Sequence, residues 1–273
     1  MRKDRLIPAT IVGLLAAYLA WTIWQPGGAV VLLHLTHVLF TVTAWLAAIL
    51  ALRASRMFEP GVSSRRVWLL FGAGMTALAI SESLWIAYHV AGQPIPYPSL
   101  VDIVWGIGFV PILASLVLQY RALHVQLSQR QKLSILAAYV GVLIVIVALS
   151  LGYVMSHPGE VAVMQMLVGA YYLVGDLGVA FLGTLSLVYL GGGLVARPWV
   201  YMVVSILSFA VAGLAFSYGT WTNTYVTGSN FLSAVVDVAY LAGYLLAAAG
   251  GYSQLTLRLP AVDDVAYPHR RMT

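Results

Sequence analysis

Long apolar stretches alternate with short polar ones along the whole chain. Each apolar stretch is about 20 residues long, the length that a helix needs to cross the roughly 30 Å hydrocarbon core of a bilayer. The stretches are continuous in Leu, Ala and Val, whereas the strands of an outer-membrane barrel alternate apolar and polar residues. The pattern therefore predicts eight membrane-spanning helices, at Leu6–Trp24, Ala29–Leu52, Val67–Val90, Leu100–Tyr120, Leu133–Met155, Val163–Leu190, Trp199–Thr220 and Phe231–Gln254.

The composition supports an all-α, polytopic integral membrane protein. Of the 273 residues, 61% are hydrophobic and 8% are charged, whereas a typical soluble domain has about 25% charged residues. The lipid bilayer is thus the first predicted partner. The chain contains no cysteine, which excludes disulfides, thiol chemistry, thiolate metal sites and palmitoylation.

The basic residues predict the orientation of the helices. All 14 Lys and Arg residues lie in the N-terminal segment, in the second, fourth and sixth loops, or in the tail, and the other four loops have none. Basic loops stay on the cytoplasmic side of a membrane. We therefore expect both termini in the cytoplasm, in a bacterial inner (cytoplasmic) membrane. We expect the first apolar stretch to be a signal-anchor helix rather than a cleaved signal peptide.

The two halves of the chain resemble each other. When the third and fourth predicted helices are aligned with the seventh and eighth, Asp102 pairs with Asp237, and an aromatic residue follows each of them one turn later. An even number of helices in each half gives both halves the same orientation. We predict two parallel four-helix repeats, 1–132 and 133–254. We also predict a short cytoplasmic tail, 255–273, too short to fold alone and without an output domain.

Ionisable residues inside the apolar stretches are the main functional candidates, because a charge inside a bilayer is costly. Glu82, Asp237 and His37 are predicted about 9–12 Å below the outer ends of their helices, with Asp176 nearer the midplane. Polar groups from different helices at similar depth favour a polar pocket that opens to the outer side. Its predicted ligand-binding residues are Glu82, Asp237, Asp176, His37, His89, Tyr88, Trp85 and Asn223.

A structural role for the same carboxyl groups is the main alternative. A buried carboxylate accepts hydrogen bonds from hydroxyl groups of a neighbouring helix and so fixes the register between the two. The donors available for this are Ser81, Ser83, Tyr171 and Tyr172. Asp102 has a local explanation, because Ser99-Leu-Val-Asp102 is typical of a helix capping box.

Two histidines raise the question of a cofactor. His34 and His37 are three residues apart and are predicted to share a helix face. Imidazoles inside membrane helices can ligate haem b, so a haem-binding subunit with His34 or His37 as ligand is one alternative. A metal site that adds Glu82 is another. Apart from these alternatives, no cofactor and no metal are predicted.

Several functional classes lack their motifs. No predicted span contains a lysine, which excludes a retinal Schiff base. The chain has no glycine-rich phosphate loop and no zinc-protease or serine-hydrolase motif, so we do not expect an enzyme. No basic surface extends beyond the short loops, so we expect no nucleic-acid partner.

Three short motifs resemble a known membrane region. These are Pro96-Tyr-Pro-Ser-Leu-Val-Asp-Ile-Val-Trp105, Tyr172-Leu-Val-Gly-Asp176-Leu, and Val236-Asp-Val-Ala-Tyr-Leu-Ala-Gly-Tyr244. They are similar to the multi-spanning N-terminal regions of bacterial diguanylate cyclases (GGDEF and EAL proteins) and of some sensor histidine kinases. The resemblance implies a membrane sensor or anchor for a cytoplasmic output domain. The chain departs from that family at Leu173, where proline is common, and in lacking the output domain.

Three functional hypotheses follow from these observations. The first is a sensory, ligand-binding membrane protein for a small molecule or lipid, which signals through or docks on a separate protein partner. The second is a haem-binding or structural subunit of a membrane complex. The third is a small-solute or proton-coupled transporter, because parallel repeats and buried carboxyl groups are also features of transporters.

Overall fold

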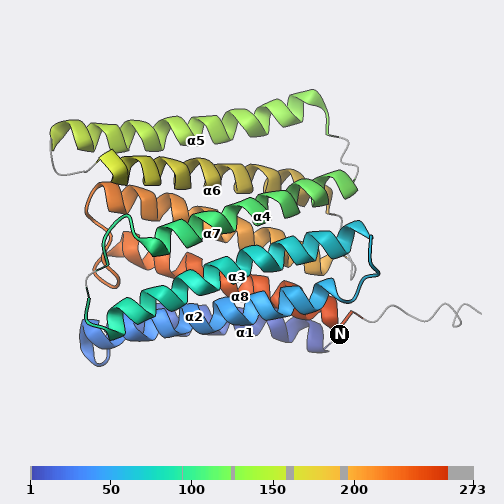
Figure 1. Ribbon diagram of the computed structural model, residues 1–273, viewed down its shortest axis with the longest axis horizontal. Helices are drawn as coiled ribbons and strands as arrows, with labels where there is room; N and C mark the ends of the chain where they lie inside the picture. Colours follow the sequence, from blue (N-terminus) through green and yellow to red (C-terminus); the bar gives the residue numbers. More distant parts are fainter. Residues whose placement is uncertain (1, 94, 124–126, 158–162, 191–195, 258–273) are drawn as a thin grey trace, which may run out of the picture.

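The computed structural model describes residues 2–93, 95–123, 127–157, 163–190 and 196–257, apart from the side chains of residues 2–5 and 189. Every regular element in these residues is a helix (Figure 1). The helices are α1 (Arg2–Trp24), α2 (Gly28–Ser55), α3 (Ser63–Val90), α4 (Leu100–Ala122), α5 (Gln129–Ser156), α6 (Val163–Tyr189), α7 (Arg197–Trp221) and α8 (Phe231–Leu255).

In the described residues, eight helices are long and apolar enough to cross a membrane. This finding confirms the prediction of an all-helical, polytopic membrane protein, and each predicted stretch corresponds to one helix. Three helices begin four residues earlier than predicted: α1 begins at Arg2, α3 at Ser63 and α5 at Gln129. The polar first turns of these helices carry no long apolar run, but the backbone continues its hydrogen bonding through them.

Local capping explains where several helices begin. The predicted capping box of α4 is confirmed, because the Ser99 N–H donates to Oδ2 of Asp102 at 2.7 Å. At the start of α8, Oδ1 of Asn230 accepts a hydrogen bond from the Ser233 N–H at 2.9 Å. These side chains satisfy N–H groups that have no partner within the helix itself.

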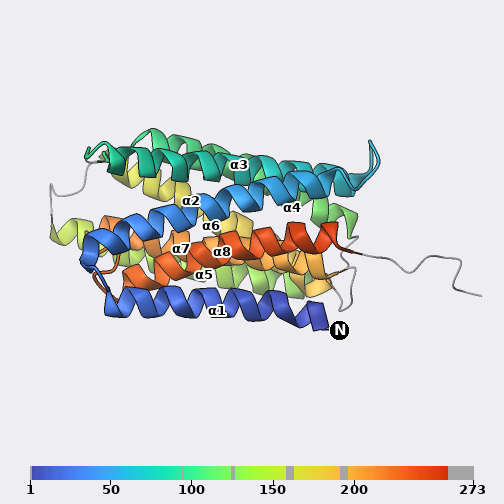
Figure 2. The same cartoon turned by 90° about the horizontal axis from the view of Figure 1, so that it is seen from below.

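Six of the helices form a closed ring. In succession α2 packs on α3, α3 on α4, α4 on α6, α6 on α7 and α7 on α8, and α8 returns to α2. The other two lie outside this ring: α1 packs on α8, and α5 on α6 and α7 (Figures 1 and 2). Only 6% of the spanning window of α5 is buried, against 39–50% for the ring helices, so the ring forms the core of the protein.

Glycines bring the ring helices into close contact. A methyl group added at Gly74 of α3 would lie 3.0 Å from the carbonyl oxygen of Gly108 on α4. At Gly251 of α8 it would lie 2.7 Å from the carbonyl carbon of Leu50 on α2. No side chain fits in these gaps without a shift of backbone. Close approach at small residues is the usual basis of helix packing within membranes.

The two ends of the ring differ in charge. The α2–α3 connection, the end of α4 and the starts of α5 and α7 form what we call the basic end, with Arg53, Arg56, Arg65, Arg66, Arg121, Arg130, Lys132 and Arg197. The opposite end has the connections 25–27, 91–99 and 222–230, which contain no lysine or arginine. We call it the non-basic end; these connections lie on the left of Figure 1.

Candidate functional site

A cavity of about 130 Å³ lies inside the ring, near the non-basic end. One water molecule needs about 10–15 Å³ of such cavity volume. The cavity therefore has room for about ten waters, or for a ligand with roughly ten non-hydrogen atoms. All six ring helices and the α7–α8 connection contribute to its wall. The lining residues are Leu33, His37 and Phe40 of α2, Glu82, Trp85 and His89 of α3, Val101, Asp102 and Trp105 of α4, Tyr172 and Asp176 of α6, Gly213 and Phe216 of α7, Tyr225 and Thr227 of the connection, and Tyr240 of α8.

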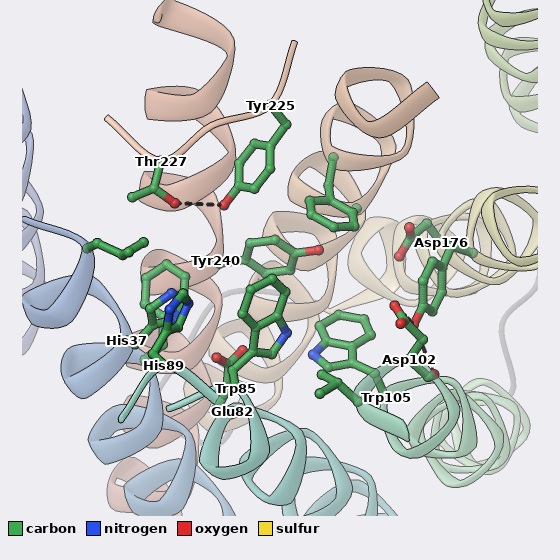
Figure 3. Close-up of a pocket in the computed structure, with 16 residues that line it drawn as sticks. His37, Glu82, Trp85, His89, Asp102, Trp105, Asp176, Tyr225, Thr227 and Tyr240 are labelled. Carbon is green, nitrogen blue, oxygen red and sulfur yellow. Dashed lines mark hydrogen bonds between the residues drawn. The ribbon is translucent and has the colours of Figure 1, made fainter. Parts of the chain in front are cut away.

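The wall of the cavity combines aromatic rings with acids. Seven of the sixteen lining side chains are Phe, Trp or Tyr, three are carboxylic acids and two are histidines. None of the sixteen is a lysine or an arginine. Figure 3 shows the rings of Tyr240, Trp85 and Trp105 between the histidines on one side and Asp102 and Asp176 on the other. The cavity is therefore apolar in surface, with a few polar groups at defined places.

Glu82 holds α3 to α8 at the wall of the cavity. Its side chain is only 6% exposed, and Oε1 accepts a hydrogen bond from the Tyr244 hydroxyl at 2.7 Å. The indole N–H of Trp105 is directed toward the same carboxyl group (Figure 3). The donors expected from the neighbouring serines are used elsewhere: Ser81 donates to the carbonyl oxygen of Val101 at 3.1 Å, and Ser83 donates within its own helix.

Asp176 is the most isolated polar group of the site. It is 1% exposed, and neither carboxyl oxygen has a hydrogen-bond partner among the described residues. The tyrosines expected to donate to Asp176 donate to α4 instead. The Tyr171 hydroxyl donates to the carbonyl oxygen of Gly106 at 2.8 Å, and the Tyr172 hydroxyl donates to the carbonyl oxygen of Asp102. Gly213 of α7 leaves the space that this carboxyl group fills, because a methyl group there would overlap its oxygens.

His37, Trp85 and His89 stack against one another. The ring centroids of His37 and His89 are 4.4 Å apart, and those of His37 and Trp85 are 5.3 Å apart. His37 is 7% exposed, and both of its ring nitrogens lack hydrogen-bond partners among the described residues. His37 can therefore donate one hydrogen bond and accept another from a ligand.

His34 is not among the residues that line the cavity. It is exposed, and its Nδ1 lies 2.7 Å from the carbonyl oxygen of Val30. Three residues turn a helix by about 300°, so His34 lies about 60° around α2 from His37 and nearly one turn closer to the start of the helix. The rings of His37 and His89 are in direct contact, with centroids 4.4 Å apart. The described residues include no group of three or more His, Cys, Asp or Glu side chains that could hold a metal ion.

Asp237 lies behind the wall rather than in it. It is 0% exposed, and Oδ1 accepts a hydrogen bond from the Tyr225 hydroxyl at 2.8 Å. Tyr225 and Thr227 line the cavity in its place. Burial raises the pKa of Tyr225 well above its usual range, and the nearby Asp237 carboxylate raises that pKa further. The tyrosine therefore stays protonated and keeps donating to Asp237.

Two predicted residues, Tyr88 and Asn223, are not part of the wall. Asn223 is exposed, with φ 52°, where the chain turns after α7. Asparagine tolerates this left-handed conformation better than most residues, so its role is in the backbone. Tyr88 follows Glu82 by six residues, a rotation of about 240°, which points it away from the face that carries Trp85 and His89.

The sequence analysis missed part of the wall. Asp102 was interpreted only as a helix cap, but its Oδ1 also accepts a hydrogen bond from the Tyr172 hydroxyl at 3.2 Å. Trp105 and Tyr240, which lie one turn after Asp102 and Asp237, pack edge to face with centroids 5.7 Å apart. Spacing of three to four residues from each acid was the signal that could have identified both aromatic residues.

The chain was compared with protein-family models, with curated proteins and with solved structures. None of the three comparisons gives a match. The function is therefore argued from the cavity itself.

Proposed function

We propose that this protein is a membrane receptor that binds a small ligand in the cavity at its non-basic end. The observation that carries the proposal is a cavity inside the ring with two buried side chains, Asp176 and His37, whose polar atoms lack partners among the described residues. Buried polar groups are nearly always hydrogen-bonded in proteins. A pair without partners inside a cavity is what a binding site presents before its ligand arrives.

The orientation we infer places the cavity on the outer side of a bacterial inner membrane. Support comes from the basic end, since loops rich in lysine and arginine remain in the cytoplasm. The start of α1 and the end of α8 lie at that same end (Figure 1). A ligand then reaches the cavity from outside, through connections that carry no basic residue.

We also infer that the ring consists of two parallel repeats, 1–132 and 133–254. If α2, α3 and α4 are exchanged with α6, α7 and α8, the order of contacts around the ring stays the same. In particular, the contact of α8 with α2 corresponds to the contact of α4 with α6. The outer helices depart from this symmetry: α1 rests on α8 of the other half, whereas α5 rests on its own half. The cavity lies between the two halves, where ligand sites of repeat-built membrane proteins are found.

The receptor would pass its signal to a separate protein partner at the basic end. The resemblance to the membrane regions of diguanylate cyclases and sensor kinases supports a sensory role. So does the way two acids join the cavity wall to α8, since Glu82 bonds Tyr244 and Asp237 bonds Tyr225. Binding, rather than a reaction, is the activity that this arrangement supports.

Native mass spectrometry of the protein purified in mild detergent tests the proposal, together with an absorption spectrum of the same sample. We expect a colourless protein carrying a small molecule or lipid that is lost in Asp176→Asn. A visible absorption band would contradict the receptor proposal and indicate a haem-binding subunit instead. An empty protein that retains a second polypeptide would make it a docking subunit with structural carboxyl groups.

A transporter is the second candidate, because a smaller apolar cavity lies on the other side of Trp105. That cavity measures about 10 Å³ and shares Trp105 with the first, beside Phe109 and Phe209. A transport path would require the two spaces to become connected, and Trp105 is the residue that lines both. Uptake by proteoliposomes distinguishes the candidates: a receptor binds its ligand without accumulating it, and a transporter accumulates it in response to a proton gradient.

A further inference from the structure

We propose that the ligand is a small organic cation, whose ammonium group is held by Asp176 among the aromatic side chains of the cavity. The inference rests on the receptor function proposed above and names the chemical class of its ligand. The starting observation is the make-up of the wall, which has three acids, seven aromatic rings and no basic side chain other than two histidines.

Asp176 is the acid that lacks a donor. The other two acids of the wall have donors from the protein: Asp102 accepts from Ser99 and Tyr172, and Glu82 accepts from Tyr244. Both oxygens of Asp176 are left without a partner among the described residues, although the group is 1% exposed. A ligand that donates hydrogen bonds and carries a positive charge satisfies this group, whereas an anion does not.

Aromatic rings surround the position that such a cation would occupy. Figure 3 shows Tyr240 beside Asp176, with its hydroxyl pointing to the same side of the cavity. Trp105 packs edge to face on both Tyr240 and Tyr172, with centroids 5.7 Å and 6.0 Å away. Rings of this kind attract ammonium groups by cation–π interaction, which is stronger where water is excluded.

The opposite side of the cavity suggests what the rest of the ligand contains. Both ring nitrogens of His37 lack partners among the described residues, and the His37 ring packs against those of Trp85 and His89. It offers hydrogen bonds to a second group of the ligand, and the stacked rings offer it an apolar surface. The volume of about 130 Å³ limits the whole ligand to roughly ten non-hydrogen atoms. Small aromatic amines and short aliphatic amines, whose ammonium groups carry N–H donors, meet these conditions.

The approach to the cavity is also suited to a cation. The connections 25–27, 91–99 and 222–230 contain no lysine or arginine that would repel it. All eight described basic residues of the ring helices and their connections lie at the far end. The field inside the non-basic end is thus set by its acids, which favours a cation over an anion of the same shape.

Calorimetry on the whole chain in lipid nanodiscs tests the charge preference directly, with empty nanodiscs subtracted. The probes are phenethylammonium, its neutral isostere 2-phenylethanol, the anion phenylacetate, and ethanolammonium as a polar cation that also carries N–H donors. We expect both cations to bind, with 2-phenylethanol at least about tenfold weaker than phenethylammonium and phenylacetate not binding. This comparison uses the wild-type protein and so does not depend on any variant folding.

Asp176→Asn then tests the anchor, with Glu59→Gln as the matched loss of one exposed carboxylate at the basic end. We expect Asp176→Asn to abolish the preference for phenethylammonium over 2-phenylethanol, and Glu59→Gln to leave it unchanged. Equal affinity for the cation and its neutral isostere in the wild-type protein would overturn the inference, as would a preference for phenylacetate or no binding of either cation. Binding of the neutral or anionic probe inside the cavity would still leave the receptor function standing.

Discussion

The hydrogen bond between Tyr244 and Glu82 joins α8 to α3 across the ring, and its removal should weaken the protein measurably. The two atoms are 2.7 Å apart, and the bond is buried. Tyr244→Phe removes the hydroxyl without changing the ring, which packs on Phe209 with centroids 4.8 Å apart. The substitution therefore isolates the hydrogen bond from the packing.

The expected size of the effect follows from two competing considerations. A hydrogen bond to a charged group contributes about 1.5–3 kcal/mol to the stability of a soluble protein. In membrane helices the measured average is only about 0.6 kcal/mol, because the unfolded state in the bilayer also finds partners. The Tyr244 bond is short and buried, and its loss leaves one acceptor of Glu82 unsatisfied. We expect a loss of about 1–2 kcal/mol in the free energy of unfolding.

Unfolding in mixed micelles, followed by far-ultraviolet circular dichroism, measures this free energy. Tyr252→Phe is the matched control, since Tyr252 is exposed on the same helix, and its loss should be near zero. Adding Glu82→Gln completes a double-mutant cycle, in which we expect a coupling of about 1 kcal/mol. Equal losses for Tyr244→Phe and Tyr252→Phe, or fully additive losses in the cycle, would refute the role assigned to this bond.

Three further predictions concern the surroundings of the cavity. Gly213→Ala should lower the free energy of unfolding by about 1–3 kcal/mol and weaken ligand binding, because the added methyl group overlaps the Asp176 carboxyl group. Gly152→Ala is the control: a methyl group there has nothing within 4 Å, so stability should not fall. Equal effects of the two substitutions would contradict this reasoning. Tyr225→Phe should reduce the loss of stability that the wild type shows above about pH 10: the pKa of Tyr225 is raised in the folded state, so there the unfolded state loses its proton first and the wild type loses stability as pH rises. An identical slope for the two proteins above about pH 10 would contradict that. Asn223→Val should lower the free energy of unfolding by about 1–2 kcal/mol, because the backbone at this position has a φ of 52°, whereas Asn223→Gly should be tolerated. Both variants should keep the wild-type affinity for ligand. A binding defect in either variant would place Asn223 in the site after all.

The helices were predictable from the sequence because length and hydrophobicity alone determine them. Eight apolar stretches correspond to eight helices among the described residues, and the lysines and arginines described in α2 to α8 and their connections lie at one end of the bundle. The capping box at Ser99 and Asp102 was also predictable, since all of its atoms lie within four consecutive residues. Structural features that depend on a local run of residues were therefore predicted correctly.

The arrangement of the helices was not predictable in the same way. In a soluble helix the polar face identifies the side that faces water, but a membrane helix is apolar both toward lipid and toward its neighbours. The closed order from α2 to α8 leaves no trace in the pattern of any single helix. The sequence indicates which face of a helix points inward only near the acids. Trp85 and His89, three and seven residues after Glu82, lie on the inward face of α3, whereas Tyr88 does not.

The position of α8 explains how a ligand in the cavity can affect the opposite end of the protein. Tyr244 of α8 bonds Glu82 in the wall, and Asp237 of α8 bonds Tyr225. Near the basic end, Gly251 lies against the backbone of α2 at Leu50, and Gly250 against the backbone of α7. Contacts between backbones have little freedom to absorb a displacement, because no flexible side chain lies between them. In the receptor proposed here, a ligand that shifts either acid would therefore move α2 and α7 together with α8, so the basic end is where a partner would detect the occupied state.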